Sequence, residues 1–539
     1  MTRQKMTGGE AVVAQLLAHD VDTIFGIPGG QNLAIYDALC SERARIRHLL
    51  GRHEQGLTYM ADGYSRASGR LGVVTTTSGP GVANMACAMA QATTDTSSVL
   101  AVSSTVHSEL IGKNRGGLHD HGESLEIMRA VCRYAVRCET VDEIPAAVHN
   151  LIVALRDGRP GGAYLEIPCD VLGERAAVEI LPAGQRSRPA PDDNAVRQAV
   201  ELLADAQRPV LWVGTGATLS DAGAEVAELA ERLGAAVVMT ILGRGLLPAD
   251  DPHVVMADGA LLTEVSQFVS EADVVLAVGT MFKQEDTAAW EAQLGEQLIH
   301  IDIDPDEQGR SYSPTVSLVA DAKAALAAIL QQLPSRSPAP PAWIERGRQA
   351  EAARLDQRRT ASPTEMQALD ILRDAVPRDG LIVCDRCNLG YWFFRCGPGY
   401  VPRTFQYPMG YGGLGGALPQ AIGSKLAQPF KPVVCVIGDG GFQFTGTELA
   451  TAVQEQVPIT IVLCNNRGFG AIRAGQDRGF GGRRYGVDLI NPDFQKLAAA
   501  YGIPASRCDS LDEFADQLPA AVRAGDLRMV ELTVDLADP

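Results

Sequence analysis

Short runs of apolar residues alternate with helical patterns along the whole chain. A continuous apolar run predicts a strand that is buried on both faces, and such strands alternating with helices are typical of parallel sheets. We therefore predict an α/β fold of doubly wound parallel sheets, with ligands bound at the carboxyl ends of the strands. The predicted strands lie at residues 21–27, 46–50, 71–77, 98–104, 209–214, 235–240, 274–279, 298–303, 381–385, 432–439 and 458–465, and the predicted helices at 54–69, 222–234 and 446–456.

Two segments rich in proline, serine and arginine interrupt this alternation, at residues 181–193 and 333–342. They have neither helical nor strand periodicity, which is typical of linkers. A chain of 539 residues is long enough for about three domains. We assign an N-terminal domain to residues 1–180, a central domain to 190–335 and a C-terminal domain to 360–539.

The chain is acidic, since 47 Lys and Arg against 65 Asp and Glu give a net charge of −18. Such a charge provides no electrostatic footprint for nucleic acid or for an anionic membrane, although a local basic pocket remains compatible with it. The sequence shows neither a signal peptide nor about 18 uninterrupted apolar residues that would span a membrane. The 11 cysteines, an odd number, lie mostly in apolar runs and indicate reduced thiols. We therefore expect a cytoplasmic protein.

The strongest motif follows two consecutive predicted strands. The first strand ends in Gly438-Asp439-Gly440-Gly441, and the second ends in Asn465-Asn466. Because a right-handed crossover makes these strands parallel neighbours, Asp439 and Asn466 are expected at the same sheet edge. Glycines let backbone N–H groups approach a phosphate, and carboxylate and amide oxygens are the ligands that Mg²⁺ prefers. A backbone carbonyl near Gly468 is a candidate third ligand.

This pair of motifs resembles the thiamine-diphosphate-binding motif of the acetolactate synthase, pyruvate oxidase and benzoylformate decarboxylase group. The resemblance implies a pyrimidine-binding domain, a central domain and a diphosphate-binding domain, in that order. It also implies that Asp439, Asn466 and the Gly468 carbonyl hold Mg²⁺, which bridges the cofactor diphosphate. Leu414 falls where the family keeps an aliphatic residue that bends the cofactor into a V. The further cofactor contacts that it implies are Ile27, Gly30, Pro80, Asn388, Gly412, Gly438, Gly440 and Gly441.

The segment RHEQGLTYMADGYSRASG, which contains Glu54, resembles the catalytic-glutamate segment of the same family. The resemblance implies that the Glu54 carboxylate bonds N1′ of the aminopyrimidine and promotes loss of the thiazolium C2 proton. A raised pKa in a largely apolar cleft would suit such a proton relay. In the family the two half-sites come from different chains, so the resemblance also implies a homodimer or homotetramer with shared active sites.

His119 and Asp120 stand where the acetolactate synthases have a Phe-Gln pair. We interpret them as catalytic residues of a polar or proton-transferring site, and a solvated loop is the alternative. In the central domain, Gly214-x-Gly216 lacks the third glycine of a dinucleotide fingerprint. The segment 242–245 loosely resembles the flavin-contacting segment of acetolactate synthases, so FAD is a possible second cofactor.

The resemblance implies thiamine-diphosphate- and Mg²⁺-dependent decarboxylation of a small-molecule 2-oxo acid through an enamine, with release of an aldehyde or transfer of the acyl unit. No Trp follows the Asn465-Asn466 pair, unlike in the acetolactate synthases, and segments around Glu54 and Asp439 look more like the guanidino-oxopentanoate decarboxylase branch. An acetolactate-synthase-like carboligase is the first alternative. A non-catalytic regulatory paralogue and a nicotinamide dehydrogenase are the others, and the intact Glu54, Asp439 and Asn466 argue against the former.

Overall fold

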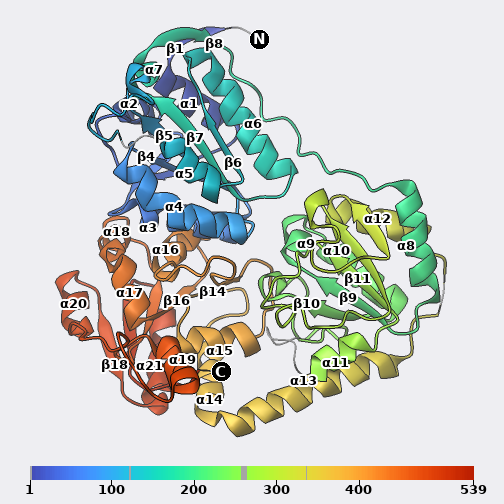
Figure 1. Cartoon of the computed structure of the whole chain (residues 1–539). Helices are drawn as coiled ribbons and strands as arrows, with labels where there is room; N and C mark the ends of the chain where they lie inside the picture. Colours follow the sequence, from blue (N-terminus) through green and yellow to red (C-terminus); the bar gives the residue numbers. More distant parts are fainter. Residues whose placement is uncertain (1–2, 121–122, 257–263, 336, 539) are drawn as a thin grey trace.

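The computed structural model describes residues 3–120, 123–256, 264–335 and 337–538. It consists of three α/β domains, each built on a parallel sheet covered by helices on both faces (Figure 1). The predicted fold class is confirmed. In Figure 1 the first domain lies above the third, and the central domain lies beside them.

The sheet of the first domain has six strands, all parallel. Alternate strand residues serve two cores: Phe25 and Val74 pack with the third domain, whereas Ile24 and Val73 pack on the opposite face. The order is β3 (Arg47–Leu50), β2 (Thr23–Gly26), β4 (Gly72–Thr76), β5 (Val99–Thr105), β7 (Gly162–Pro168) and β6 (Tyr134–Arg137), with helices α1 (Gly8–Ala18), α2 (Leu33–Ser41), α3 (Glu54–Ser68), α4 (Pro80–Thr94), α5 (Ser124–Val131), α6 (Ile144–Asp157) and α7 (Cys169–Gly173), and an antiparallel pair β1 (Gln4–Thr7) and β8 (Arg175–Val178).

The central domain has a five-stranded parallel sheet. Of its helices, the sequence predicted only the one at residues 222–234; among the others is α13 (Pro341–Ala361), which begins inside the predicted linker 333–342 and runs toward the third domain (Figure 1). The order is β10 (Ala236–Met239), β9 (Pro209–Val213), β11 (Val274–Val278), β12 (Gln297–Asp302) and β13 (Val316–Val319), with helices α8 (Asp193–Asp205), α9 (Thr215–Leu219), α10 (Gly223–Leu233), α11 (Glu264–Ser270) and α12 (Ala322–Gln332).

The third domain has a six-stranded parallel sheet in which β16 and β17 are neighbours, with Gly438 opposite Cys464. The predicted helix 446–456 is shorter in the structure: residues 446–448 form a 3-10 turn, and the α-helix covers residues 449–454. The order is β15 (Phe405–Gln406), β14 (Leu381–Cys384), β16 (Val433–Gly438), β17 (Thr460–Cys464), β19 (Arg528–Leu532) and β18 (Ala505–Cys508), with helices α14 (Pro363–Ala375), α15 (Asn388–Cys396), α16 (Ala417–Ala427), α17 (Asp439–Thr445), α18 (Leu449–Gln454), α19 (Gly470–Phe480), α20 (Phe494–Ala500) and α21 (Leu511–Ala524).

Helices α3 and α16 join the first and third domains into one core. Their backbones cross closely, since a Cβ on Gly63 would lie 2.1 Å from the Gln420 carbonyl oxygen and one on Gly423 would lie 1.9 Å from that of Met60. Across the same contact Gln420 donates a 2.6 Å hydrogen bond to the buried Asp62. This packing fixes the position of the α3 N-terminus relative to the third domain.

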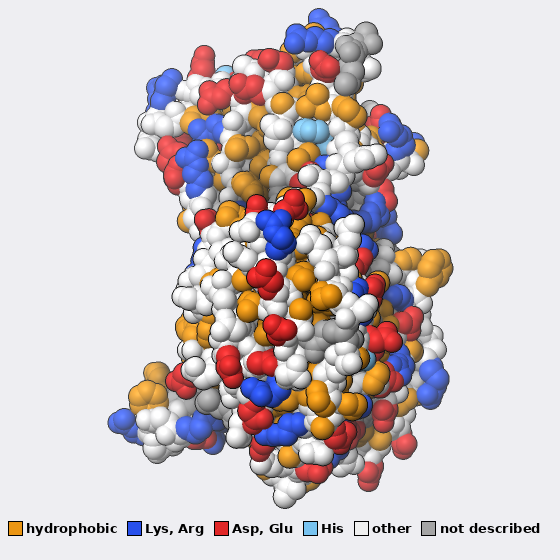
Figure 2. Space-filling model, turned by 90° about the vertical axis from the view of Figure 1, so that its right-hand side faces the viewer, with side chains coloured by type: hydrophobic (Ala, Val, Ile, Leu, Met, Phe, Trp, Pro, Cys, Tyr) orange, Lys and Arg blue, Asp and Glu red, His pale blue; other side chains and the backbone are white. Residues whose placement is uncertain are grey.

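Among the described residues, no helix is both long and apolar enough to cross a membrane. Lys and Arg are interspersed with Asp and Glu over the face of the molecule that Figure 2 shows.

Candidate active site

The carboxyl ends of β14, β16 and β17 surround a cavity in the third domain, which we call the diphosphate cavity. It brings together every third-domain residue that the sequence predicted for the site. These lining residues are Asn388, Gly412, Leu414, Gly438, Asp439, Gly440, Gly441, Asn466 and Gly468.

Asp439 is the first residue of α17 and is buried. Its Oδ2 accepts hydrogen bonds from the Gly468 backbone N–H at 3.0 Å and from Asn491 Nδ2 at 2.6 Å. Burial raises the pKa of Asp439, and the bond from Asn491 opposes that shift. A divalent cation bound here would favour the ionised carboxylate, because opposite charge stabilises it.

Two amide side chains meet over Gly470. A Cβ on this glycine would lie 2.4 Å from Asn466 Nδ2 and 3.0 Å from Asn388 Oδ1, so a larger residue would displace the two amides. Asn388 Nδ2 donates to the Leu536 carbonyl, which holds its amide in place. Asp439, Asn466 and Gly468 all line the cavity, and carboxylate, amide and carbonyl oxygens are the kinds of donor that Mg²⁺ prefers, so the chemistry of these residues is compatible with the ion.

Asn491 is a functional candidate that sequence reasoning missed. Its amide donates to Asp439 and, at 2.9 Å, to Asn465 Oδ1. The chain returns to this place because Gly468 and Asp488 form an antiparallel bridge. Asn491 follows no predicted strand, so no signal in the sequence placed it beside the metal motif.

Leu414 is half-buried in a loop that two glycines shape, Gly412 with φ +71° and Gly415 with φ +83°. Such backbone angles favour glycine strongly. The buried Asp385 holds this loop, because its Oδ2 accepts from the Gly415 N–H at 2.7 Å. Burial raises the pKa of Asp385 to about 6, although backbone N–H bonds oppose the shift.

The predicted residues of the first domain lie on a different rim, at the carboxyl ends of neighbouring strands. Ile27 and Gly30 follow β2, Glu54 follows β3 and Pro80 follows β4. Glu54 begins α3, is half-buried, and accepts a 2.9 Å hydrogen bond from Asn84. Among the described residues, the lining of the diphosphate cavity includes none from this rim.

His119 lies on the same rim as these residues. Its Nδ1 is 3.2 Å from Gln31 Oε1, which also accepts a 2.9 Å hydrogen bond from Thr77. The backbone of His119 has φ +65°, a strained angle for a side chain of this size. Asp120, the next residue, is half-buried, and its N–H donates to the Gly117 carbonyl at 3.0 Å. The neighbouring His121 lies outside the described residues.

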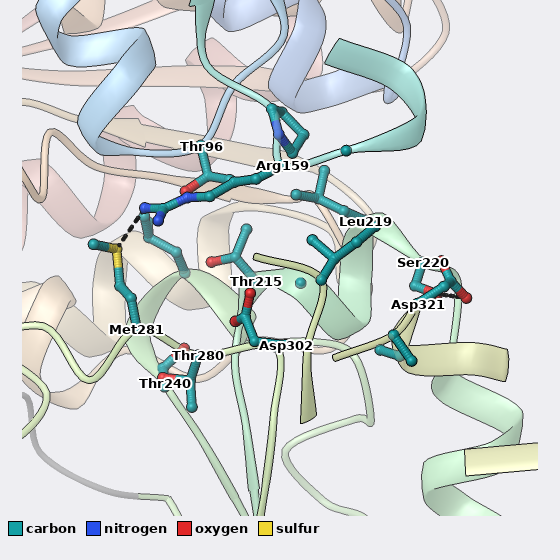
Figure 3. Close-up of a pocket in the computed structure, with 18 of the residues that line it drawn as sticks. Thr96, Arg159, Thr215, Leu219, Ser220, Thr240, Thr280, Met281, Asp302 and Asp321 are labelled. Atoms are coloured by element: carbon teal, nitrogen blue, oxygen red, sulfur yellow. Dashed lines mark hydrogen bonds between the residues drawn. The ribbon is translucent and has the colours of Figure 1, made fainter. Parts of the chain in front are cut away.

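The central domain has its own cavity at the carboxyl ends of its strands, where it faces Thr96 and Arg159 of the first domain (Figure 3). Asp302 points into it, and burial raises its pKa to about 7 against the opposing Asp304 N–H. We call this the central cavity.

The two central-domain motifs contribute to packing. Gly214 and Gly216 lie against Gly279, where a Cβ on Gly214 would be 2.3 Å from its carbonyl oxygen. Arg244 is buried and donates to the Phe393 and Gly397 carbonyls of the third domain, both at 3.1 Å. Arg244 is therefore part of the domain interface. The central cavity, and not these two motifs, is the place where FAD would bind.

Three segments of the chain match the domains described for thiamine pyrophosphate enzymes. Residues 6–127 match the N-terminal TPP binding domain, 196–329 the central domain and 387–532 the C-terminal TPP binding domain.

Whole-length relatives agree with these matches. A probable 2-ketoarginine decarboxylase of Pseudomonas aeruginosa is 37% identical over 98% of this chain and 94% of its own length. A probable acetolactate synthase large subunit of Methanocaldococcus jannaschii is 31% identical over 99% of this chain and 93% of its length. The acetolactate synthase of Mycobacterium bovis is 31% identical over 98% and 88%, respectively.

The chain belongs to the family of thiamine pyrophosphate enzymes. Within it, the chain falls in the group that contains the decarboxylases and acetolactate synthases. The two TPP-binding domains imply thiamine diphosphate as cofactor, and Mg²⁺ is typical of the family.

Proposed function

We propose that this enzyme decarboxylates a 2-oxo acid, with thiamine diphosphate and Mg²⁺, and releases an aldehyde. The observation that carries the choice of reaction is the similarity to a probable 2-ketoarginine decarboxylase, at 37% identity over 98% of the chain. The polar residues at 119 and 120 support it, since aldehyde release requires a proton donor near the reacting carbon.

Residues of the diphosphate cavity would hold the cofactor. Asp439, Asn466 and the Gly468 carbonyl would bind Mg²⁺, and the backbone at Gly440 and Gly441 would approach the diphosphate. Leu414 would support the bend between the two rings. Thiamine diphosphate, when bound, supplies the nucleophilic carbon and accepts the electron pair that CO₂ leaves behind.

Residues of the first-domain rim would move protons. The Glu54 carboxylate would exchange a proton with the aminopyrimidine ring, and Asn84 orients it through the 2.9 Å bond. His119 would give or take the proton at the substrate carbon, and Gln31 orients its ring. Asp120 would act beside it on the polar side of the substrate.

We propose that two copies of the chain complete each site, in a homodimer or homotetramer. Glu54 is not among the described residues that line the diphosphate cavity of its own chain, and this supports the proposal, since both must reach the same cofactor. Apolar side chains exposed near the cavity in sequence also suit an interface between copies. They are Tyr411, Phe444, Ile472 and Phe480, each exposed by more than half.

Carboligation of the acetolactate synthase type is the second candidate. It is supported by relatives of that name at 31% identity over nearly the whole chain. The two reactions share the release of CO₂, and they differ in whether a proton or a second carbonyl compound would be taken up afterwards. Access of the second substrate past His119 would therefore decide the product.

Thermal-shift assays with thiamine diphosphate plus Mg²⁺, FAD and NAD separately test the cofactor. Incubation with a panel of 2-oxo acids, including pyruvate and 5-guanidino-2-oxopentanoate, tests the reaction, each acid alone and paired with an aldehyde. CO₂ with an equal amount of aldehyde supports the proposal. A C–C coupled product from acid alone or from a pair would replace it by carboligation, and stabilisation by NAD without thiamine diphosphate would refute both.

A further inference from the structure

The three domains meet at a short backbone segment, Pro408–Gly410, which leads into the loop that carries Leu414. The N–H groups of Met409 and Gly410 donate to the carboxylate of Asp95 at 3.0 and 2.7 Å. Asp95 comes from the first domain, directly after α4, and is buried. One first-domain carboxylate therefore holds the start of a third-domain loop.

Asp95 also binds cations from two domains. Lys283 Nζ of the central domain lies 2.8 Å from Oδ1, and Arg66 Nη2 of the first domain lies 3.0 Å from Oδ2. Gln91 donates to the same carboxylate. Burial alone would raise the pKa of Asp95, but the charges of Lys283 and Arg66 hold it below its usual value. Asp95 is therefore an ionised acceptor for the backbone of the segment.

The carbonyl groups of the same segment are held by Arg386. Its Nε donates to the Pro408 carbonyl and its Nη2 to the Met409 carbonyl, both at 3.2 Å. Arg386 lines the diphosphate cavity and lies against Gly412, where a Cβ would be 2.9 Å from Nε. Its Nη2 is also 3.4 Å from Glu285 Oε1 of the central domain.

Asp95 and Arg386, which hold the segment 408–410, are thus each bound by a residue of the central domain. These two central-domain residues are two positions apart in the sequence. Lys283 binds Asp95, which holds the N–H groups, and Glu285 binds Arg386, which holds the carbonyls. Lys283 also lines the central cavity, as does Met281, whose sulfur contacts Arg159 at 3.2 Å (Figure 3). Neither Lys283 nor Glu285 lines the diphosphate cavity in the described part of the chain.

We propose that Lys283 and Glu285 are positioning residues for the cofactor: through Asp95 and Arg386 they fix the segment 408–410 and so the place of Leu414 in the diphosphate cavity. This inference rests on the proposed binding of thiamine diphosphate in that cavity. It gives the central domain a part in cofactor binding that does not depend on any ligand in the central cavity.

The expected loss of cofactor affinity is taken from the effect of comparable supporting contacts in other proteins. Loss of a group that orients a ligating or binding residue commonly costs about 10- to 100-fold in affinity. We therefore expect Lys283→Met and Glu285→Gln to weaken binding of thiamine diphosphate by about 10-fold or more. Lys283→Arg keeps the charge toward Asp95 and should bind within about 3-fold of wild type.

The test is the Kd of thiamine diphosphate for the full-length apoprotein at saturating Mg²⁺, measured by titration calorimetry, with thermal unfolding of each apoprotein beside it. Arg133→Met is the matched control, because Arg133 pairs with Asp304 at 2.6 Å across the same two domains but touches no part of the segment 408–410.

Weaker binding in Lys283→Met and Glu285→Gln, with rescue in Lys283→Arg and near-normal affinity in Arg133→Met, supports the proposal. Unchanged affinity in both test variants, or an equal loss in Arg133→Met, overturns it. Should Lys283→Met not fold, Glu285→Gln decides alone, since Glu285 is more exposed and its pair is longer. Failure of the wild-type chain to bind thiamine diphosphate overturns the proposed function as well, whereas normal wild-type binding confines a failure to this inference.

Discussion

Replacement of Glu54 by glutamine tests the proposed proton transfer with little change to the fold. Glu54 is the first residue of α3, and its Oε2 accepts a hydrogen bond from Asn84 at 2.9 Å. Glutamine has the same size and keeps one oxygen acceptor, but it cannot take or give a proton. The variant therefore separates the acid–base role of the side chain from its structural role.

Positioned general acids and bases contribute about 10²- to 10⁴-fold in rate, which corresponds to roughly 3–5.5 kcal/mol of activation free energy. The stability effect is much smaller. A carboxylate in the first turn of a helix is worth about 0.3–1 kcal/mol through the helix dipole. We therefore expect Glu54→Gln to lose about 100-fold or more in kcat while its free energy of unfolding falls by less than about 1 kcal/mol.

Glu448→Gln provides the matched control with the opposite profile. Glu448 is buried and accepts from the backbone N–H groups of Arg52 and His53, which precede α3. Glutamine removes the negative charge that accepts these hydrogen bonds, and a hydrogen bond to a charged group is worth about 1.5–3 kcal/mol in stability. We expect its kcat to fall by less than about 10-fold, because it exchanges no proton with the cofactor.

The assay is CO₂ release at saturating thiamine diphosphate and Mg²⁺, with urea unfolding of the same preparations. Turnover of Glu54→Gln within about 3-fold of wild type would refute the role of Glu54. Loss of turnover that only parallels loss of stability, as in the Glu448 control, would assign Glu54 a structural role instead.

Three further predictions concern single groups. Asn491→Ala removes the 2.6 Å bond to Asp439. The Mg²⁺ concentration needed for half-maximal binding of thiamine diphosphate should rise by about 10-fold, and an unchanged concentration would contradict this. Leu414→Ala should lower kcat by about 10-fold while the Mg²⁺ affinity at Asp439 stays the same, and a parallel loss of both would count against a positioning role. Asp302 has a folded pKa of about 7, raised by burial, so the folded state holds a proton that the unfolded chain has lost between about pH 4 and 7. Unfolding free energy should therefore fall as pH rises from about 4 to about 7, by up to about 1.4 kcal/mol per unit, and Asp302→Asn should flatten that slope; equal slopes in urea titrations at these pH values would exclude the effect.

Local sequence patterns and the family resemblance predicted the parallel sheets and one half-site. Strands such as β16 and β17 are apolar throughout because both faces are buried, and the crossover rule then placed Asp439 and Asn466 at one edge. By contrast, the sequence pattern did not predict α13. Its buried residues Trp343, Gly347, Ala350 and Arg354 do not form an apolar stripe.

The tertiary structure alone decided the contacts between residues distant in sequence. Asn491 reaches Asp439 only because the chain folds back through the Gly468–Asp488 bridge, and Asp95 reaches Gly410 across 315 positions. Such contacts have no local signature, since they depend on where whole domains pack. The amino-acid sequence determined which strands form and which chemistry their ends can carry, whereas domain packing determined that Lys283 of the central domain and Asp95 of the first domain meet.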